Sequence, residues 1–360
     1  MDKRMVEKTL QEILDGIRPK DMTAMEEAKK NWLNVAKPLF SLGKLEKAVI
    51  DMAGMKGTSD YTLDKRGLLI FCADNGVVEE GVTQSGQEVT AIVSDNFTKN
   101  ATSVCKMAQI AKVDVMPIDI GIVIDVPSIT KKELKVAYGT KNMTKEAAMT
   151  REEAVKAILI GIDAVKTCKE AGYDILATGE MGIGNTTTSS AIASVMLDKP
   201  VELVTGKGAG LTGEGLDRKI LAIKKAIKLN EPNVADPIDV LAKVGGLDIA
   251  GLVGVFLGGA RYGIPVVIDG FICGVAALLA VRICPVAREY MMPSHVSKEP
   301  AGQMLLKELE LEPYITCDMC LGEGTGAVAV LPLLDMGLAV YRQMSTFADI
   351  NIDNYEVFEK

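Results

Sequence analysis

The sequence predicts an α/β fold in which a mainly parallel, doubly wound sheet is joined to a smaller helical domain. Three features predict this fold. Short apolar runs alternate with amphipathic, helix-like stretches through the middle of the chain, as strand–helix–strand crossovers require. Glycine-rich polar turns follow several of these runs. Both ends of the chain show helical spacing of apolar residues and no strand signal.

The helices at the two ends of the chain are expected to form one small domain. Apolar residues recur at helical spacing through residues 1–60, and again from 327 to 341 with a helical continuation to Ile350. We therefore divide the chain into a small helical domain, residues 1–60 plus 327–360, and a large α/β domain, residues 61–326.

The large domain is expected to alternate strands with helices. Strands are expected at residues 67–72, 113–118, 174–177, 264–268 and 290–292, and helices at residues 88–99, 103–111, 151–171, 185–197, 215–229, 247–261 and 271–282. Pro117 is expected to end the second strand, and Thr150 to cap the helix that follows it. Residues 264–284 are as long and apolar as a membrane span, but Pro265 and Asp269 favour a strand, a tight turn and a buried helix.

Composition narrows the classes of function. A net charge of −8 leaves no excess of Lys and Arg for a nucleic-acid backbone, and an aromatic content of 4% disfavours stacking on single-stranded bases. Residues 1–20 lack the features of a signal or transit peptide, and seven scattered cysteines indicate reduced thiols, so a cytoplasmic protein is expected. Cys317 and Cys320 have metal-ligand spacing without further ligands, so no metal and no cofactor are expected. The single histidine, His295, is either catalytic or structural, and a lone histidine between a strand and a helix is more often structural.

Two glycine turns follow predicted strands, and open α/β sheets bind ligands at the carboxyl ends of their strands. Asp74-Asn-Gly76 leads into a polar loop, residues 79–87, which either lines a site or is an ordinary surface loop. Residues 178–188 carry three glycines followed by Asn and Thr residues at a helix start. The free N–H groups and hydroxyls there suit a phosphate; the alternative is a capped helix after a tight turn. This turn is neither a P-loop nor a full dinucleotide fingerprint.

Two further turns carry charged side chains. Residues 206–210, with Lys219 downstream, offer amides and cations to an anion, or form a flexible loop. Glu323 lies between Gly322 and Gly324 in a stretch almost without other charges. An apolar setting raises the pKa of a carboxyl group and makes it a base near neutral pH, although a turn glutamate near a helix start is also common. The residues alone thus indicate an enzyme for a phosphorylated small molecule, with Glu323 as the candidate general base.

Taken in order, these stretches resemble one family, the nicotinate-nucleotide:dimethylbenzimidazole phosphoribosyltransferases, which activate the lower ligand of cobalamin. The similarity covers nearly the whole chain. The matching strings are Phe71-Cys-Ala-Asp-Asn-Gly76, Gly179-Glu-Met-Gly-Ile-Gly-Asn-Thr-Thr187, Val244-Gly-Gly-Leu-Asp248, Asp269-Gly-Phe271, Pro293-Ser-His295 and Leu321-Gly-Glu-Gly-Thr-Gly326, with Ser41-Leu-Gly-Lys-Leu-Glu46 near the N-terminus.

The resemblance implies a Rossmann-like large domain, a small domain built from both chain ends, and a dimer with itself or with a paralogue. It also implies that an aromatic base displaces nicotinate from nicotinate mononucleotide, giving an α-ribotide and nicotinate without a metal. Glu323 would take the proton of the attacking base. A phenol or adenine as the base, or a subunit role in a heterodimer, is the alternative. A Rossmann-type oxidoreductase is a remote one, because the first turn lacks Gly-x-Gly-x-x-Gly.

The resemblance also assigns roles to individual residues. Glu323 and Glu180 would be the catalytic carboxylates, with Glu180 near the ribose. The phosphate and ribose would be held by Gly182, Gly184, Asn185, Thr186, Thr187, Gly208 and Lys219; the nicotinate or ribose by Asp269, Gly270 and Ser297; and the base by Asp74, Ser85, Val93, Met181 and Leu321.

Several residues near the base depart from the family pattern. The first turn commonly reads Asp-His-Gly, where this chain has Asn75, and a proline commonly follows the serine where it has Gly86. Some members place glutamine at the position of Val93, and Pro-Pro-Gly-Ser-Leu-Gly becomes Pro38-Leu-Phe-Ser-Leu-Gly43. The catalytic string is intact while the base pocket is altered, so the identity of the base stays open.

Overall fold

The computed structural model describes residues 3–208 and 210–357 and contains a five-stranded parallel sheet. The strands are β1 (Arg66–Ala73), β2 (Val113–Gly121), β3 (Ile175–Met181), β4 (Val266–Ile268) and β5 (Met291–Pro293). They lie in the order β2-β1-β3-β4-β5, and every neighbouring pair is parallel. The prediction of a doubly wound α/β sheet is confirmed. The winding direction reverses between β1 and β3, the switch point beside which such sheets bind ligands.

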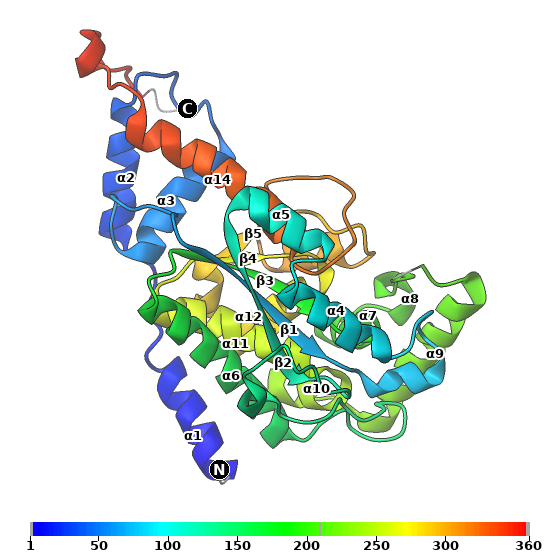
Figure 1. Ribbon diagram of the computed structural model, residues 1–360. Helices are drawn as coiled ribbons and strands as arrows, with labels where there is room; N and C mark the ends of the chain where they lie inside the picture. The colour runs from blue at the N-terminus through cyan, green and yellow to red at the C-terminus, as the bar shows by residue number, and fades with distance from the viewer. Residues whose placement is uncertain (1–2, 209, 358–360) are drawn as a thin grey trace.

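Helices cover both faces of the sheet (Figure 1). On one face lie α11 (Leu247–Tyr262) and α12 (Phe271–Ile283), with α6 (Arg151–Glu170) packed against α11. On the other face lie α4 (Glu88–Thr98), α5 (Ser103–Ala111) and α14 (Thr325–Gln343). The remaining helices of this part are α7 (Asn185–Met196), α8 (Val201–Val204), α9 (Gly213–Asn230), α10 (Pro237–Val244) and α13 (Gly302–Glu308). α11 is buried almost all round because it is enclosed by the sheet, α6 and α12.

The two ends of the chain meet beside the sheet. Helices α2 (Met22–Asn34) and α3 (Lys44–Lys56) pack together, and α14 packs against α3. An antiparallel bridge joins Val35 to Thr346, and the Phe347 amide donates to the Asn34 carbonyl at 2.9 Å. The segment that follows α14 is this bridge and a short 3₁₀ turn (Ala348–Ile350), not the continued helix that the spacing predicted.

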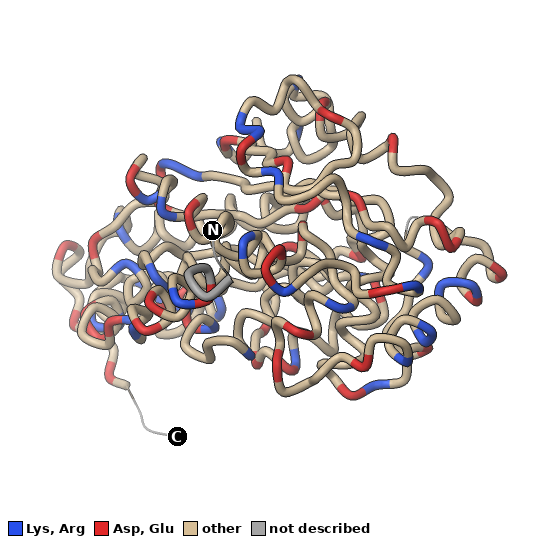
Figure 2. Tube along the Cα trace, turned by 90° about the horizontal axis from the view of Figure 1, so that it is seen from below, with Lys and Arg blue, Asp and Glu red and all other residues tan. Residues whose placement is uncertain are grey.

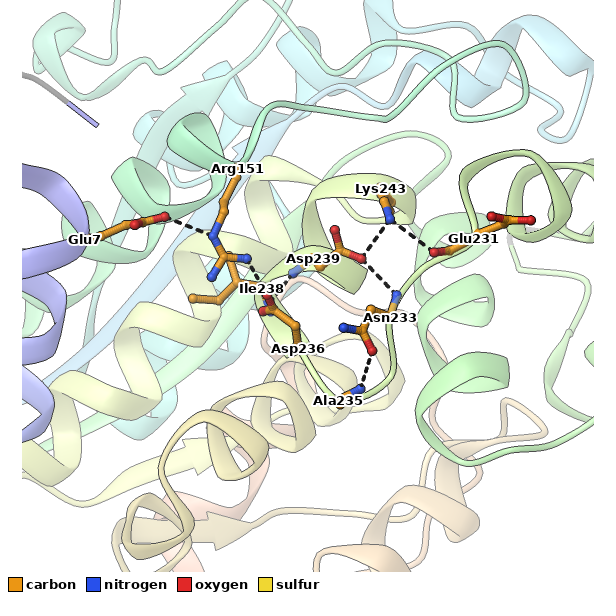
Figure 3. Close-up of polar contacts among 9 residues, drawn as sticks. All are labelled: Glu7, Arg151, Glu231, Asn233, Ala235, Asp236, Ile238, Asp239 and Lys243. Atoms are coloured by element: carbon orange, nitrogen blue, oxygen red, sulfur yellow. Dashed lines mark hydrogen bonds and ion pairs between the residues drawn. The ribbon is translucent and has the colours of Figure 1, made fainter. Parts of the chain in front are cut away.

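Helix α1 (Lys3–Leu14) lies against α6 and α11, apart from α2 and α3 in Figure 1. Arg151, at the start of α6, donates from Nε to Glu7 at 3.0 Å and from Nη1 to Asp236 at 2.7 Å. Asp236 in turn caps α10 by accepting from the amides of Ile238 and Asp239 (Figure 3). Arg151 therefore links α1 to two helices of the large α/β part, while the division into two domains stays a prediction.

Three local expectations can be compared with the structure. The prediction that Pro117 ends the second strand is wrong, because β2 continues to Gly121. The proline is tolerated there since β2 is an edge strand, where the N–H that proline lacks would have no further strand to bond. Thr150 caps α6 as predicted, through a capping box with Glu153. The apolar stretch after residue 264 forms β4 and the buried helix α12, as predicted. Helices α8, α10 and α13 were not predicted, since all three are short.

One helix of the described residues, α14, is long and apolar enough to span a membrane by length and composition. More than half of its most apolar window is buried, and it packs against α3, α5 and β3, as a core helix does.

Lys and Arg residues alternate with Asp and Glu residues over the trace seen in Figure 2. This mixture offers no broad basic face, on the side shown, to a nucleic-acid backbone.

Candidate active site

A cavity of about 390 Å³ lies at the carboxyl ends of β3, β4 and β5. Most of the predicted site residues line it: Ser85, Val93, Glu180, Met181, Gly182, Asn185, Thr186, Gly208, Asp269, Gly270, Ser297, Leu321 and Glu323. The other four, Asp74, Gly184, Thr187 and Lys219, are not among its lining residues. Residues from six separate stretches of the sequence thus meet at one end of the sheet.

Glu323 is held in an unusual turn before α14. Gly322, Glu323 and Gly324 have consecutive positive φ angles of 85°, 60° and 92°, a region that non-glycine residues rarely adopt. The Glu323 carboxylate accepts a hydrogen bond at Oε2 from the Val104 amide, 3.3 Å away in the first turn of α5. Burial raises the pKa of Glu323, the Val104 bond lowers it, and the negative Asp269 raises it further. A half-buried carboxylate with a raised pKa is suited to general-base work.

Asp269 fixes the turn that carries Glu323. Its Oδ2 accepts from the Gly324 amide at 3.2 Å, and its Oδ1 accepts from the Gly326 and Ala327 amides at 2.7 and 3.1 Å. These amides at the start of α14 have no partners within the helix, so a carboxylate satisfies them well. Burial raises the pKa of Asp269 to about 6, although the amide bonds oppose the shift. The Asp269 side chain therefore joins the end of β4 to the start of α14.

Glu180 belongs to a buried chain of polar groups. The Asn185 amide nitrogen donates both to Glu180 and, at 2.9 Å, to Asp248. Burial, and next the negative charge of Asp248, raise the pKa of Glu180 to about 8. Burial likewise raises the pKa of Asp248 to about 6. At neutral pH, Glu180 is therefore largely protonated and able to donate a hydrogen bond into the cavity.

Lys219 lies directly behind the cavity wall. Its Nζ donates to Thr186 Oγ1 at 2.8 Å and to the Gly206 carbonyl at 3.2 Å. Gly208 has a φ of 53°, and a Cβ there would lie 2.8 Å from Thr186 Oγ1. Burial lowers the pKa of Lys219 to about 8, opposed by the nearby carboxylate of Glu299. A hydroxyl and a cation thus meet where α7 begins, an arrangement suited to a phosphate.

The other predicted residues outside the lining support the site from behind. Asp74 is fully buried and accepts from the Val123 amide at 2.8 Å, so it holds the turn after β1. Gly184 precedes the first residue of α7, and the Thr187 side chain is buried within that helix. Their assigned ligand roles stay predictions.

Of the five residues expected to meet the base, four line the cavity and three of these are apolar. Val93 comes from α4, Met181 from the end of β3 and Leu321 from the turn before Glu323, while Ser85 adds a hydroxyl. Val89, also of α4, adds a further apolar side chain to the lining. Cys317 is exposed, and no group of three or more His, Cys, Asp or Glu side chains within the described residues could hold a metal ion.

A family model described as "Phosphoribosyltransferase" matches residues 17–352, nearly the whole chain and all of the cavity described above. This chain belongs to that phosphoribosyltransferase family. The resemblance seen in its sequence motifs is therefore confirmed.

Similar proteins carry one name. The nicotinate-nucleotide–dimethylbenzimidazole phosphoribosyltransferase of Ruminiclostridium cellulolyticum is 46% identical over 98% of this chain and all of its own length. The protein of that name from Clostridium acetobutylicum is 46% identical over 96% of this chain and 99% of its own length. A crystal structure of the Thermus thermophilus protein, with the same name, is 35% identical, covers 93% of this chain and 100% of its own, and superposes with a TM-score of 0.85.

The structure adds residues to this phosphoribosyltransferase site that sequence reasoning did not assign to it. His295, expected to be structural, lies in the cavity wall, as does Glu299. Asp248 was noticed only as part of a matching string, yet it shares Asn185 with Glu180. Val104 carried no signal at all, because an amide donor at a helix start can come from any residue but proline.

Proposed function

We propose that this protein transfers the phosphoribosyl group of nicotinate mononucleotide to an aromatic base, in assembly of the nucleotide loop of cobalamin. The products are an α-ribotide and nicotinate. The observation that carries this proposal is the placement of Glu323, whose pKa is raised, in one cavity with the Thr186 hydroxyl and the Gly208 loop. A base and a phosphate-binding corner lie within one space of the size that a mononucleotide and a small ring need.

The reaction follows from the chemistry of an azole base. An azole nitrogen that still carries its proton is a poor nucleophile, so Glu323 accepts that proton as the ring attacks C1′ of the ribose. The bond from C1′ to the pyridinium nitrogen breaks, and its electron pair leaves with nicotinate, which needs no further proton. Attack opposite the leaving group inverts C1′ from β to α in one step. A phenol as base attacks through oxygen, with its proton again passing to Glu323.

The remaining residues bind and orient the two substrates. Thr186, Gly208 and, behind them, Lys219 hold the 5′-phosphate, while the protonated Glu180 donates toward the ribose. Gly270 and Ser297 face the nicotinate or the ribose. Asp269, which the resemblance assigns to the nicotinate or the ribose, also holds the turn of Glu323 through three amides.

The base meets Ser85, Val93, Met181 and Leu321. Because most of these side chains are apolar, the pocket favours a flat apolar ring such as dimethylbenzimidazole. The family resemblance further supports a dimer, with itself or with a paralogue, that works in the cytoplasm.

One assay tests the proposal. The protein is mixed with nicotinate mononucleotide and, separately, with dimethylbenzimidazole, adenine or p-cresol, and released nicotinate is measured; a reaction without base is the control. We expect base-dependent release with at least one of the three, and dimethylbenzimidazole as the best. Absence of base-dependent release from folded protein in all three reactions would refute the proposed function.

A further inference from the structure

His295 lies in the cavity wall directly after β5, with only 4% of its surface exposed. Its imidazole ring occupies space that two glycines leave open. A Cβ at Gly326 would overlap the ring at Nδ1 and Cε1, and a Cβ at Gly270 would lie 3.4 Å from both Cε1 and Nε2. The ring is therefore fixed between the turn after β4 and the first turn of α14.

The hydrogen bonds of Ser294 determine which ring nitrogen carries the proton. Ser294 Oγ lies 3.1 Å from the carbonyl oxygen of Asp269 and 3.0 Å from His295 Nδ1. A carbonyl oxygen only accepts, so the single hydroxyl proton of Ser294 is directed to Asp269. Nδ1 must then carry a proton and donate it to Ser294 Oγ. Burial lowers the pKa of His295, so the ring is neutral and Nε2 keeps a free lone pair.

This lone pair has no hydrogen-bond partner in the part of the chain that the structure describes. Among residues 3–208 and 210–357, none forms a hydrogen bond with His295 Nε2, and His295 lines the cavity together with Gly270 and Ser297. An acceptor in the wall of a cavity is free to bind a ligand, and a ligand that donates a hydrogen bond to it gains affinity and a fixed orientation.

The chemistry of the substrate identifies the donor. The carboxylate of nicotinate mononucleotide and its phosphate dianion are acceptors, so the ribose hydroxyls are the donors that this nucleotide offers. The N–H of the incoming base is the other donor, and Glu323 takes that proton. We propose that His295 Nε2 accepts a hydrogen bond from the 2′- or 3′-hydroxyl of the bound ribose and so orients C1′ toward the attacking base. This inference rests on the proposed function.

The test compares nicotinate mononucleotide with its 2′-deoxy and 3′-deoxy analogues. The wild-type protein should lose roughly 10- to 100-fold in kcat/KM with one of the two analogues. His295→Asn keeps a donor toward Ser294 but has no atom at the Nε2 position. Its kcat/KM with the normal nucleotide should therefore be lower than that of the wild type by a similar factor, and exchanging the nucleotide for that analogue should lower kcat/KM little further. His295→Gln, whose amide oxygen reaches the Nε2 position, should recover part of the preference.

Ser294→Ala is the second variant and leaves the ring in place. Without Ser294 Oγ, the Nδ1 proton loses its acceptor, the other tautomer becomes accessible, and the preference for the hydroxyl should fall several-fold. A wild-type protein that uses both deoxy analogues as well as the normal nucleotide would overturn the inference. So would an unchanged preference in a folded His295→Asn protein or, if that variant does not fold, in Ser294→Ala. Absence of turnover by the wild type with the normal nucleotide would instead reject the proposed function itself.

Discussion

The carboxylate of Glu323 accepts a hydrogen bond from the amide of Val104, 219 positions earlier in the chain, at 3.3 Å. The contact places an acidic group at the start of α5, where the helix dipole favours the charged form. Burial acts in the opposite direction and prevails, since the pKa of Glu323 is raised. The Val104 bond thus opposes burial and the charge of Asp269, which both raise the pKa of the candidate base, and this bond can be removed without touching the carboxylate.

Val104→Pro removes that effect, because proline has no N–H and is tolerated in the first turn of a helix. The pKa of Glu323 should rise, since burial would act without the opposing bond. Glu323 must be ionised to accept a proton, so kcat/KM rises with pH through this pKa, and the variant's acidic limb should shift to higher pH. Ser103→Pro, which keeps the Val104 amide, is the control. A pH profile of Val104→Pro that coincides with this control would contradict the role of the bond.

Asp269→Asn tests whether the turn of Glu323 must be fixed. The variant places an NH₂ group among three N–H donors, so about 1–3 kcal/mol of stability should be lost. The value of kcat should fall roughly 10- to 100-fold, because a misplacement of about 1 Å costs up to about 100-fold in rate. The KM for the nucleotide should change little. Asp236→Asn, at the distant cap of α10, is the control for stability and should keep its kcat. Normal kcat in Asp269→Asn would show that the turn needs no such support.

Glu180→Gln tests the buried, raised pKa of Glu180, about 8 against 4.5 for an ordinary glutamate. Between these values the folded protein binds more protons than the unfolded chain, so the free energy of unfolding should decrease as pH rises. The contribution is complete below about pH 4.5 and is lost as pH passes through the folded pKa. Urea unfolding at several pH values from 5 to 8.5 measures this slope. Glu180→Gln should have a shallower slope, because glutamine does not titrate; equal slopes would contradict the raised pKa.

Lys219→Met tests the phosphate corner. The variant removes the cation that donates to Thr186, so KM for nicotinate mononucleotide should rise tenfold or more. Nicotinate riboside lacks the phosphate and should be affected much less. Lys207→Met, an exposed lysine in the loop between Gly206 and Gly208, is the control. Equal losses for nucleotide and riboside in Lys219→Met would show that Lys219 supports the fold and not the phosphate.

The sequence sufficed for the sheet and for most of the cavity. β1 is a continuous apolar run because both of its faces are covered, and the glycine turns lie where parallel strands end, so both were visible. Contacts between segments that lie far apart in the chain could not be predicted from the sequence. The sequence could not show that Asp269 also accepts hydrogen bonds from three amides at the start of α14. His295 likewise gained its significance from Ser294, Gly270 and Gly326, which meet only in the folded chain.

The most direct measurement is the rate of nicotinate release by Glu323→Gln at saturating mononucleotide and base, beside calorimetric binding of the mononucleotide alone. Glutamine keeps the size of the side chain and its acceptor toward Val104 but cannot take a proton at neutral pH. The account predicts a fall in kcat of roughly 10²- to 10⁴-fold with a nearly unchanged Kd for the mononucleotide. Glu312→Gln, an exposed glutamate that precedes the same turn, should retain wild-type rates. Near-normal release by Glu323→Gln would contradict the account.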